Sequence, residues 1–173
     1  CAMRQEQNSI EVVNLCIEHK EVVGFDLAGP EVGFSVLNHK EASTLANENN
    51  VNVTLHADWE VPDGIKEVVL DSGAKRVGHG SQIINDISFE NGSIIFNNEA
   101  AKYVFENKIA LEICPTSNVQ CGAYSNVSEH SFGELYKAGF NVTINTDNRL
   151  MSDITMSEEV NNVVESFGLT EKD

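Results

Sequence analysis

Residues 51–80 form a strand, helix and strand pattern, and this unit most restricts the folds open to the chain. Apolar and polar residues alternate over 51–55 up to His56, which is typical of a strand. Apolar side chains then recur at helical spacing over 65–70, and a second short strand leads to His79. Parallel strands joined by a helix end at the same edge of a sheet, so both histidines are expected there. Imidazoles at such an edge are candidates for metal binding or proton transfer, although a single histidine at a strand end is more often structural.

Strand and helix patterns alternate along the whole chain. Strands are expected at 21–27, 51–55, 75–80, 109–114 and 140–144, after a strand tail at 1–4, and helices at 10–17, 40–50, 65–70, 98–107, 134–138 and from 157, with a loop after residue 80. Such alternation predicts an α/β fold with a parallel sheet, either open or closed into a barrel. Polar clusters follow the strands on one side only, which favours a (β/α) barrel with its site at the carboxyl-terminal face. A complete barrel needs eight strands, whereas this pattern supplies five and the tail of another. We expect residues 1–173 to form a single domain.

The charge and the cysteines restrict the partners. Acidic residues outnumber basic ones 27 to 11, and the formal net charge is -16. Binding phosphates requires clustered Lys and Arg, so this charge argues against a nucleic-acid partner and against an anionic membrane surface. No apolar run approaches the ~18 residues of a membrane-spanning helix. The four cysteines include no C-x-x-C pair. Free thiols are typical of a reducing compartment, so we expect a cytoplasmic protein.

Five segments occur in the order and at the spacing found in the adenosine deaminase family. They are DLAGPE (26–31), LHA followed by an acid (55–60), RVGHG (76–80), LEICPTSN (111–118) and VTINTDNRLMS (142–152). The resemblance implies a (β/α)8 TIM barrel of the amidohydrolase type, a class of metal-dependent hydrolase. Here the barrel is incomplete and runs from the end of strand 3 to strand 8. The chain resembles the C-terminal two thirds of a deaminase. The H-x-H pair that the family's first strand contributes does not occur in it.

The resemblance implies a zinc site. It assigns His56 and Asp147 as metal ligands, and a neutral imidazole and a carboxylate are suitable ligands for Zn²⁺. His79 resembles the family's histidine that orients the attacking water and helps to deprotonate it. Ser117 and Asn118 are expected to support the metal-binding carboxylate. In the family, bound zinc lowers the pKa of its water, so that hydroxide is available at neutral pH.

Two further residues are implied in purine binding. Gly29 resembles the glycine whose backbone N–H approaches purine N3, and the absence of a side chain permits that approach. Asn148 is expected to donate from its amide to purine N7, which is an acceptor only. Without the resemblance, both positions read as ordinary turn residues.

The catalytic acid is the point at which the sequence departs from the family. The family uses the Glu of H-A-x-E to protonate purine N1, but here His56 is followed by Ala-Asp-Trp-Glu, so Trp59 stands where Glu is expected. Glu60 is the favoured acid, and Asp58 is the alternative. A third alternative is that the acid is lost and the protein is catalytically impaired.

The activity implied is hydrolytic deamination of adenosine and 2′-deoxyadenosine to the corresponding inosine nucleosides and ammonia, in purine salvage. The alternatives are an adenine deaminase, a deaminase of N6-modified adenine nucleotides, and a catalytically impaired paralogue that binds purines. Residues 1–173 alone are expected to be inactive, because two metal ligands are absent. An incomplete barrel has two open sheet edges, and its strands are expected to be apolar on both faces. We therefore expect those edges to pair with the missing N-terminal part of the barrel or with another copy of the chain.

Overall fold

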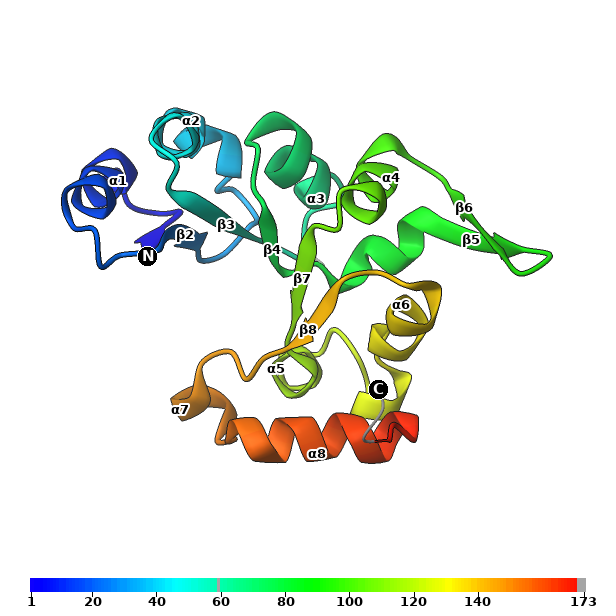
Figure 1. The fold of residues 1–173 in the computed structure, drawn as a ribbon. Coiled ribbons are helices and arrows are strands. Elements are labelled where there is room, and N and C mark those ends of the chain that lie inside the picture. Colours follow the sequence, from blue (N-terminus) through cyan, green and yellow to red (C-terminus); the bar gives the residue numbers. More distant parts are fainter. Residues whose placement is uncertain (59, 171–173) are drawn as a thin grey trace.

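A parallel sheet organises the structure. The computed structural model describes residues 1–58 and 60–170 (Figure 1). Among these residues, six strands pair side by side in the order β1-β2-β3-β4-β7-β8, and every pairing is parallel. Their bounds are β1 Ala2–Met3, β2 Gly24–Ala28, β3 Asn52–Ala57, β4 Arg76–His79, β7 Ala110–Ile113 and β8 Val142–Ile144. The predicted parallel α/β sheet of five strands and a strand tail is confirmed.

The two faces of the sheet differ. Phe25, Leu27 and Leu55 alternate along β2 and β3 with polar residues, and their side chains are fully buried in the core. The intervening Asp26 and His56 lie on the other face and line a polar hollow together with Glu112 of β7 and residues that follow β8. The expectation that the strands are apolar on both faces was therefore wrong. Apolar and polar residues alternate along these strands because only one face of the sheet is covered by helices.

Helices cover the apolar face in chain order (Figure 1). They are α1 Ser9–Glu18, α2 Lys40–Glu48, α3 Gly64–Lys66, α4 Glu99–Glu106 and α6 Phe132–Ala138; short turns η1 Val36–His39 and η2 Glu67–Asp71 precede α2 and follow α3. The helix expected at 65–70 is therefore one α-helical turn followed by a π-helical one. The strand expected from residue 21 begins at Gly24, because Val22 and Val23 are exposed. None of the described helices is long and apolar enough to cross a membrane.

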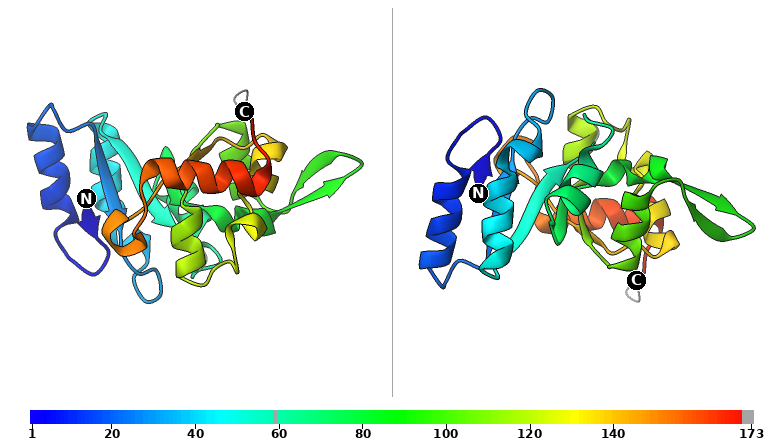
Figure 2. Two further views of the ribbon diagram at one scale, coloured as in Figure 1. Left: turned by 90° about the horizontal axis from the view of Figure 1, so that it is seen from below. Right: turned by 90° about the horizontal axis from the view of Figure 1, so that it is seen from above.

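A β-hairpin occupies the segment that was expected to be a loop. After the turn η3 (Ser81–Asp86), strands β5 (Ile87–Glu90) and β6 (Ser93–Phe96) pair antiparallel and project from the body of the molecule (Figure 2). Asn91 and Gly92 join them with positive φ angles of 49° and 79°. An Asn-Gly pair between two apolar runs is a strong hairpin signal, so this element was predictable from the sequence.

Three short elements were also not predicted. They are α5 (Pro115–Gln120), η4 (Val127–Glu129) and α7 (Arg149–Ser152). Pro115 was interpreted only as the end of a strand, but it is also the first residue of α5, where its missing N–H costs nothing. Both α5 and α7 follow strands directly and carry or flank candidate site residues.

The last helix, α8 (Met156–Phe167), packs across the end of the sheet against α5 and η4. Its first turn is closed by a reciprocal pair of hydrogen bonds between Thr155 and Glu158, so Thr155 is the N-cap and the helix begins at Met156, one residue before the expected start. At its other end, Phe167 packs on Phe132 of α6 with ring centroids 5.4 Å apart.

Gly133 is expected to be required for this packing. A Cβ at Gly133 would lie 2.4 Å from the ring of Phe167, so Gly133→Ala must displace that ring or the helix. We expect a loss of about 1–3 kcal/mol in the free energy of unfolding, measured by urea denaturation. The exposed neighbour Glu134 provides the control, because Glu134→Ala changes only the surface. Equal effects of the two substitutions would contradict this account.

Candidate active site

A cleft of about 510 Å³ lies at the carboxyl-terminal edge of the sheet. It is lined by residues at or just after the ends of five strands, β2, β3, β4, β7 and β8, among them Gly29, Glu31, His56, Asp58, Glu60, His79, Ser117, Asn118 and Asp147. The parallel register places His56 opposite Gly78 and Ala57 opposite His79. The rings of His56 and His79 consequently lie 4.7 Å apart, centroid to centroid. The structure thus brings together most of the residues that the sequence singled out.

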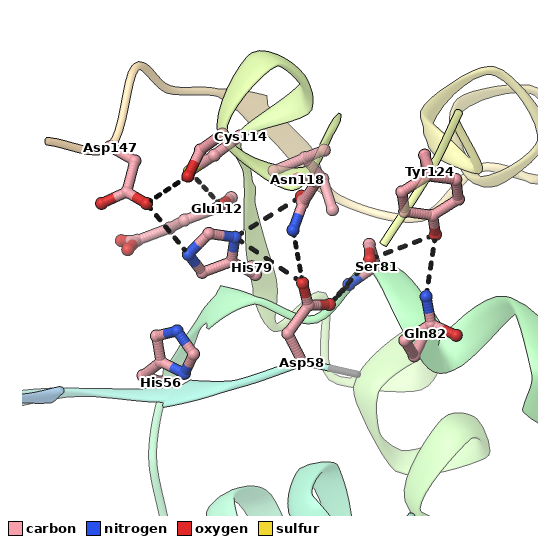
Figure 3. A network of polar contacts seen from close by, with 12 residues as sticks. His56, Asp58, His79, Ser81, Gln82, Glu112, Cys114, Asn118, Tyr124 and Asp147 are labelled. Atoms are coloured by element: carbon pink, nitrogen blue, oxygen red, sulfur yellow. Dashed lines mark hydrogen bonds and ion pairs between the residues drawn. The ribbon is translucent and has the colours of Figure 1, made fainter. Parts of the chain in front are cut away.

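His79 lies between two carboxylates. Its Nε2 is 3.6 Å from Asp147 Oδ2, and its Nδ1 is 3.7 Å from Asp58 Oδ2 (Figure 3). His79 and Asp147 both have left-handed backbones, with φ angles of 61° and 56°. Such conformations cost on the order of 1 kcal/mol or more for residues with a side chain and are concentrated at functional sites. They turn both side chains toward the cleft at the points where β4 and the segment after β8 leave the sheet.

The carboxylate of Asp147 is held by α5. Ser117 Oγ donates to Asp147 Oδ2 at 2.6 Å, as expected of a residue that supports this carboxylate. Asn118, which was expected to do the same, donates to Asp58 Oδ2 at 2.6 Å instead. The two neighbouring side chains of α5 therefore hold different carboxylates, one on each side of His79.

Asp58 belongs to a buried polar network (Figure 3). Within the described part of the chain, its carboxylate accepts from the backbone N–H of Ser81 at 3.0 Å, from Ser81 Oγ at 2.7 Å and from Asn118. Tyr124 donates to Ser81 Oγ at 3.1 Å and extends the network away from the cleft. Three donors occupy the two oxygens of Asp58, so its carboxylate serves here as an acceptor.

His130 completes this network and was given no role from the sequence. Its Nδ1 accepts from the backbone N–H of Phe132 at 3.0 Å, so Nε2 carries the proton and donates to Asn118 Oδ1 at 3.1 Å. The ring also stacks on Tyr124 at 4.1 Å. Burial, and to a smaller extent the neighbouring His79, lowers the pKa of His130 to about 4. No sequence signal pointed to it, because the contact joins segments that no motif connects.

Glu60 lies at the exposed mouth of the cleft. Its Oε2 accepts from the backbone N–H of Glu31 at 2.9 Å, which aligns the segment after β3 with the loop after β2. Trp59, which stands where the family has its acid, lies outside the described residues. Glu60 and Asp58 both line the cleft, but Glu60 is exposed and Asp58 is buried.

Glu31 is a functional candidate that sequence reasoning missed. It is buried, its Oε1 lies 3.0 Å from His56 Nδ1, and the same oxygen accepts from the backbone N–H of Asp58 at 2.7 Å. Burial by itself would raise the pKa of Glu31, but His56, the Asp58 N–H and the positive charge of Arg4 together lower it. The signal was present, since Glu31 ends the DLAGPE segment.

The two residues predicted to bind purine differ in their position relative to the cleft. Gly29 lines the cleft with a φ of 108°, a backbone conformation that residues with a side chain rarely adopt. Asn148 caps α7 instead: its Oδ1 accepts from the backbone N–H groups of Leu150 and Met151 at 3.2 and 3.3 Å. It does not line the cleft in the described structure, and its amide nitrogen is the part still available to a ligand.

The donor types of the cleft suit zinc, but their number is incomplete. His56 and Asp147 offer an imidazole nitrogen and carboxylate oxygens, the ligands that zinc prefers. Glu31 occupies the Nδ1 side of His56, which leaves Nε2 as its ligand atom. Within residues 1–58 and 60–170, no three His, Cys, Asp or Glu side chains are arranged to hold a metal ion. The chain therefore fits part of a zinc site rather than a complete one.

Comparison with known proteins agrees with this geometry. A family model described as Adenosine deaminase matches residues 1–173. The chain belongs to the adenosine deaminase family. It is 42% identical over 171 residues to the adenosine deaminase of Mycobacterium sp. (strain JLS), a match that covers 96% of this chain and 47% of the relative. The chain thus spans about half the length of the curated relatives it matches, less than the expected two thirds.

Solved structures of this family share the fold. The N6-methyl-AMP deaminase of Arabidopsis thaliana is 27% identical with a TM-score of 0.81, over 98% of this chain and 48% of that one. The adenine deaminase of Arthrobacter aurescens is 20% identical with a TM-score of 0.82, over 97% of this chain and 49% of that one. A Burkhoderia ambifaria amidohydrolase with bound Zn has a TM-score of 0.79 at 21% identity and covers 98% of this chain and 46% of that one. The sheet therefore matches half of an amidohydrolase barrel.

His130 is expected to make stability depend on pH. Its pKa is about 4 in the folded chain and about 6.5 in the unfolded one, so the unfolded state binds more protons between these values. The stabilisation is fully present above pH 6.5 and is lost as the pH falls toward 4, by on the order of 3 kcal/mol. His130→Gln should remove this part of the pH dependence in urea denaturation.

The control for this prediction is His19→Gln, since His19 is exposed at the end of α1. That variant should keep the pH dependence of the wild type. If His130→Gln costs the same free energy at pH 7 as at a pH of about 4, His130 is not held neutral by the fold.

Proposed function

We propose that this chain supplies the C-terminal half of a zinc-dependent adenosine deaminase, which hydrolyses adenosine and 2′-deoxyadenosine to the inosine nucleosides and ammonia. The observation that carries the proposal is the convergence of His56, His79 and Asp147 in one cleft at the carboxyl ends of the parallel strands. Gly29 lies on the wall of the same cleft. Membership of the family supports the reaction class, and the remaining half of the site is proposed to come from an N-terminal half of the barrel.

The residues of the cleft have distinct parts in this reaction. His56 and Asp147 would hold the zinc ion, which supplies an acidified water at neutral pH. His79, with Nε2 directed at Asp147, is placed to orient that water and to accept a proton from it. Ser117 keeps the carboxylate of Asp147 in place through its 2.6 Å hydrogen bond. Gly29 allows the purine to approach the backbone after β2.

Glu60 is the proposed acid that protonates purine N1. The environment of Asp58 argues against the alternative, because three donors already occupy its two oxygens. A carboxylate so occupied is poorly placed to donate a proton. Within the described residues, Glu60 accepts one hydrogen bond, from the Glu31 N–H, and it is open to the cleft. Asp58 is proposed instead to fix the relative positions of Ser81, Asn118 and the ring of His79.

Substitution separates these two roles. Glu60→Gln should lower kcat by roughly 10²- to 10⁴-fold while zinc content is unchanged, because only the proton donor is lost. Asp58→Asn should lower the free energy of unfolding by about 1–3 kcal/mol, because a buried acceptor of three donors is replaced by an amide. The measurements are steady-state kinetics on adenosine and urea denaturation of the assembled enzyme. A larger loss of kcat in Asp58→Asn than in Glu60→Gln would exchange the two assignments.

Two other functions remain as alternatives. One is deamination of adenine or of an N6-modified adenine nucleotide, which the fold shared with such deaminases supports. The other is a catalytically impaired paralogue that binds purines, which the displaced Glu60 supports. Turnover of adenosine, adenine and N6-methyl-AMP, measured side by side, separates all three. Preference for free adenine or for the nucleotide would overturn the adenosine assignment, and purine binding without turnover would favour the paralogue.

A second barrel half is the proposed partner of the chain. Within the described residues, β1 pairs only with β2 and β8 only with β7, so both ends of the sheet have an open edge. After β8, helix α7 exposes Leu150 and Met151 at 94% and 79%. Open edges and exposed apolar side chains are typical of surfaces that another chain segment covers. Without that segment, we propose that the edges pair with a second copy of this chain.

A chimera tests the zinc site and this partner together. It joins residues 1–173 to the N-terminal part of the Mycobacterium relative that this chain does not cover. We expect the chimera to be monomeric, to retain zinc after dialysis against a mild chelator and to consume adenosine. The isolated chain should do none of these, because each missing ligand weakens the metal site. The measurements are light scattering, zinc content and loss of adenosine absorbance.

His56→Ala in the chimera should abolish zinc retention, whereas His19→Ala on the surface should not. Tight zinc and turnover in the isolated chain would contradict the proposal that half of the site is supplied from elsewhere. A chimera that folds and retains no zinc would contradict His56 and Asp147 as ligands.

A further inference from the structure

His56 is held from two sides by buried charged residues. The guanidinium Nη2 of Arg4 donates to the backbone carbonyl of His56, and Glu31 Oε1 lies 3.0 Å from the ring Nδ1. Arg4 is 4% exposed and Glu31 is 2% exposed, so water does not compete for these contacts. The two residues come from segments far apart in the sequence, the end of β1 and the loop after β2. Both the backbone and the ring of His56 are therefore positioned by tertiary contacts.

Glu31 is itself fixed in place. Its Oε1 accepts from the Asp58 N–H at 2.7 Å, and its own N–H donates to Glu60 at 2.9 Å. These bonds tie the loop after β2 to the segment that follows His56. The position of Oε1 is thus determined independently of the His56 ring, and the ring must adapt to it.

A neutral imidazole carries an N–H on one ring nitrogen and a lone pair on the other. The carboxylate of Glu31 decides which of the two nitrogens is protonated. A lone pair on Nδ1 would face a carboxylate oxygen at 3.0 Å, which is repulsive, whereas an N–H there is attracted by the negative charge, even though the contact is not aligned as a hydrogen bond. The side chain of His56 is 28% exposed while that of Glu31 is 1% exposed, so the opposite edge of the ring is the one open to the cleft. A proton on Nδ1 leaves the lone pair on Nε2.

We propose that Glu31 is a positioning residue that holds His56 as the Nδ1–H tautomer and so presents the Nε2 lone pair to the cleft. Where this lone pair is to bind zinc, the inference rests on the proposed function. A carboxylate behind a histidine ligand fixes the tautomer and ring orientation, and its loss typically weakens metal affinity 10- to 100-fold. Arg4 supports the arrangement from the other side by fixing the backbone of His56.

The tautomer is measured directly by nitrogen NMR. In the metal-free chain labelled with ¹⁵N-histidine, at alkaline pH, His56 should show a protonated Nδ1 and an unprotonated Nε2. The signal is assigned by its loss in His56→Asn. A His56 ring protonated on Nε2 in the wild-type chain overturns the proposal, with no variant required.

Two variants and a control separate positioning from general stability. Glu31→Leu removes the acceptor and should shift His56 toward the Nε2–H tautomer, and Glu31→Gln keeps an uncharged oxygen and should give an intermediate result. Glu67→Gln is the matched control, because Glu67 lines the cavity of about 340 Å³ beside Glu31 but bonds to Ser35 and not to His56. It should leave the tautomer unchanged. If Glu31→Leu does not fold, the wild type and Glu31→Gln still decide the question, and equal tautomer populations in those two overturn it.

Metal affinity is then measured in the chimera. Glu31→Leu, or Glu31→Gln if only that variant folds, should weaken Co²⁺ or Zn²⁺ binding by about 10-fold or more, and Glu67→Gln should not. An unchanged affinity would overturn the role of Glu31 toward the metal. An inactive chimera with the expected tautomer would count against the proposed deaminase, whereas an active one with the wrong tautomer would count against Glu31 alone.

Discussion

The parallel pairing of β3 with β4 is the constraint on which the site depends. The register sets His56 opposite Gly78 and Ala57 opposite His79, so the two imidazoles come from neighbouring positions of adjacent strands. Gly78 permits this closeness, since a Cβ there would lie 3.2 Å from the Cα of His56. Regular alternation would turn His79 to the same side as Ala57, which is buried in the core, and the left-handed backbone of His79 turns its ring to the cleft instead. Every other contact of the cleft is arranged around these two rings.

Carboxylates hold both rings, and those of Glu31 and Asp58 are buried. Glu31 stands behind His56, and Asp58 stands beside His79 with the exposed Asp147 on its other side. Unpaired burial of a charge is expensive, so Glu31 and Asp58 accept hydrogen bonds from the backbone, from Ser81 and from Asn118. The net charge of -16 is consequently more than a matter of solubility. Part of it lies inside the molecule, where it orients the candidate metal ligand and proton acceptor.

The polar inner face of the sheet has a related meaning. A closed barrel packs its interior with side chains from every strand. Here Asp26, Arg76 and Glu112 lie on that face and remain partly exposed, with Arg76 Nε bonded to Glu112 Oε1 at 2.5 Å. The inner face of this half barrel is thus polar near the site, and it is open beyond the outermost described strands. This agrees with a chain that spans 47% of its curated relatives and matches half of a barrel.

The sequence by itself determined the alternation of strands and helices, the family, and the edge at which the polar residues gather. These depend on local periodicity and on short motifs, which can be recognised in one segment of sequence at a time. The hairpin at Asn91-Gly92 could be recognised in the same way and was overlooked. The cap that Asn148 makes on α7 is local, because Asn148 directly precedes that helix. Tertiary structure alone decided that Asn118 serves Asp58 rather than Asp147, and that His130 and Glu31 belong to the site. Those contacts join segments that are separated in the sequence, and a side chain's partner across such a distance depends on the packing of the whole fold, which no local pattern encodes.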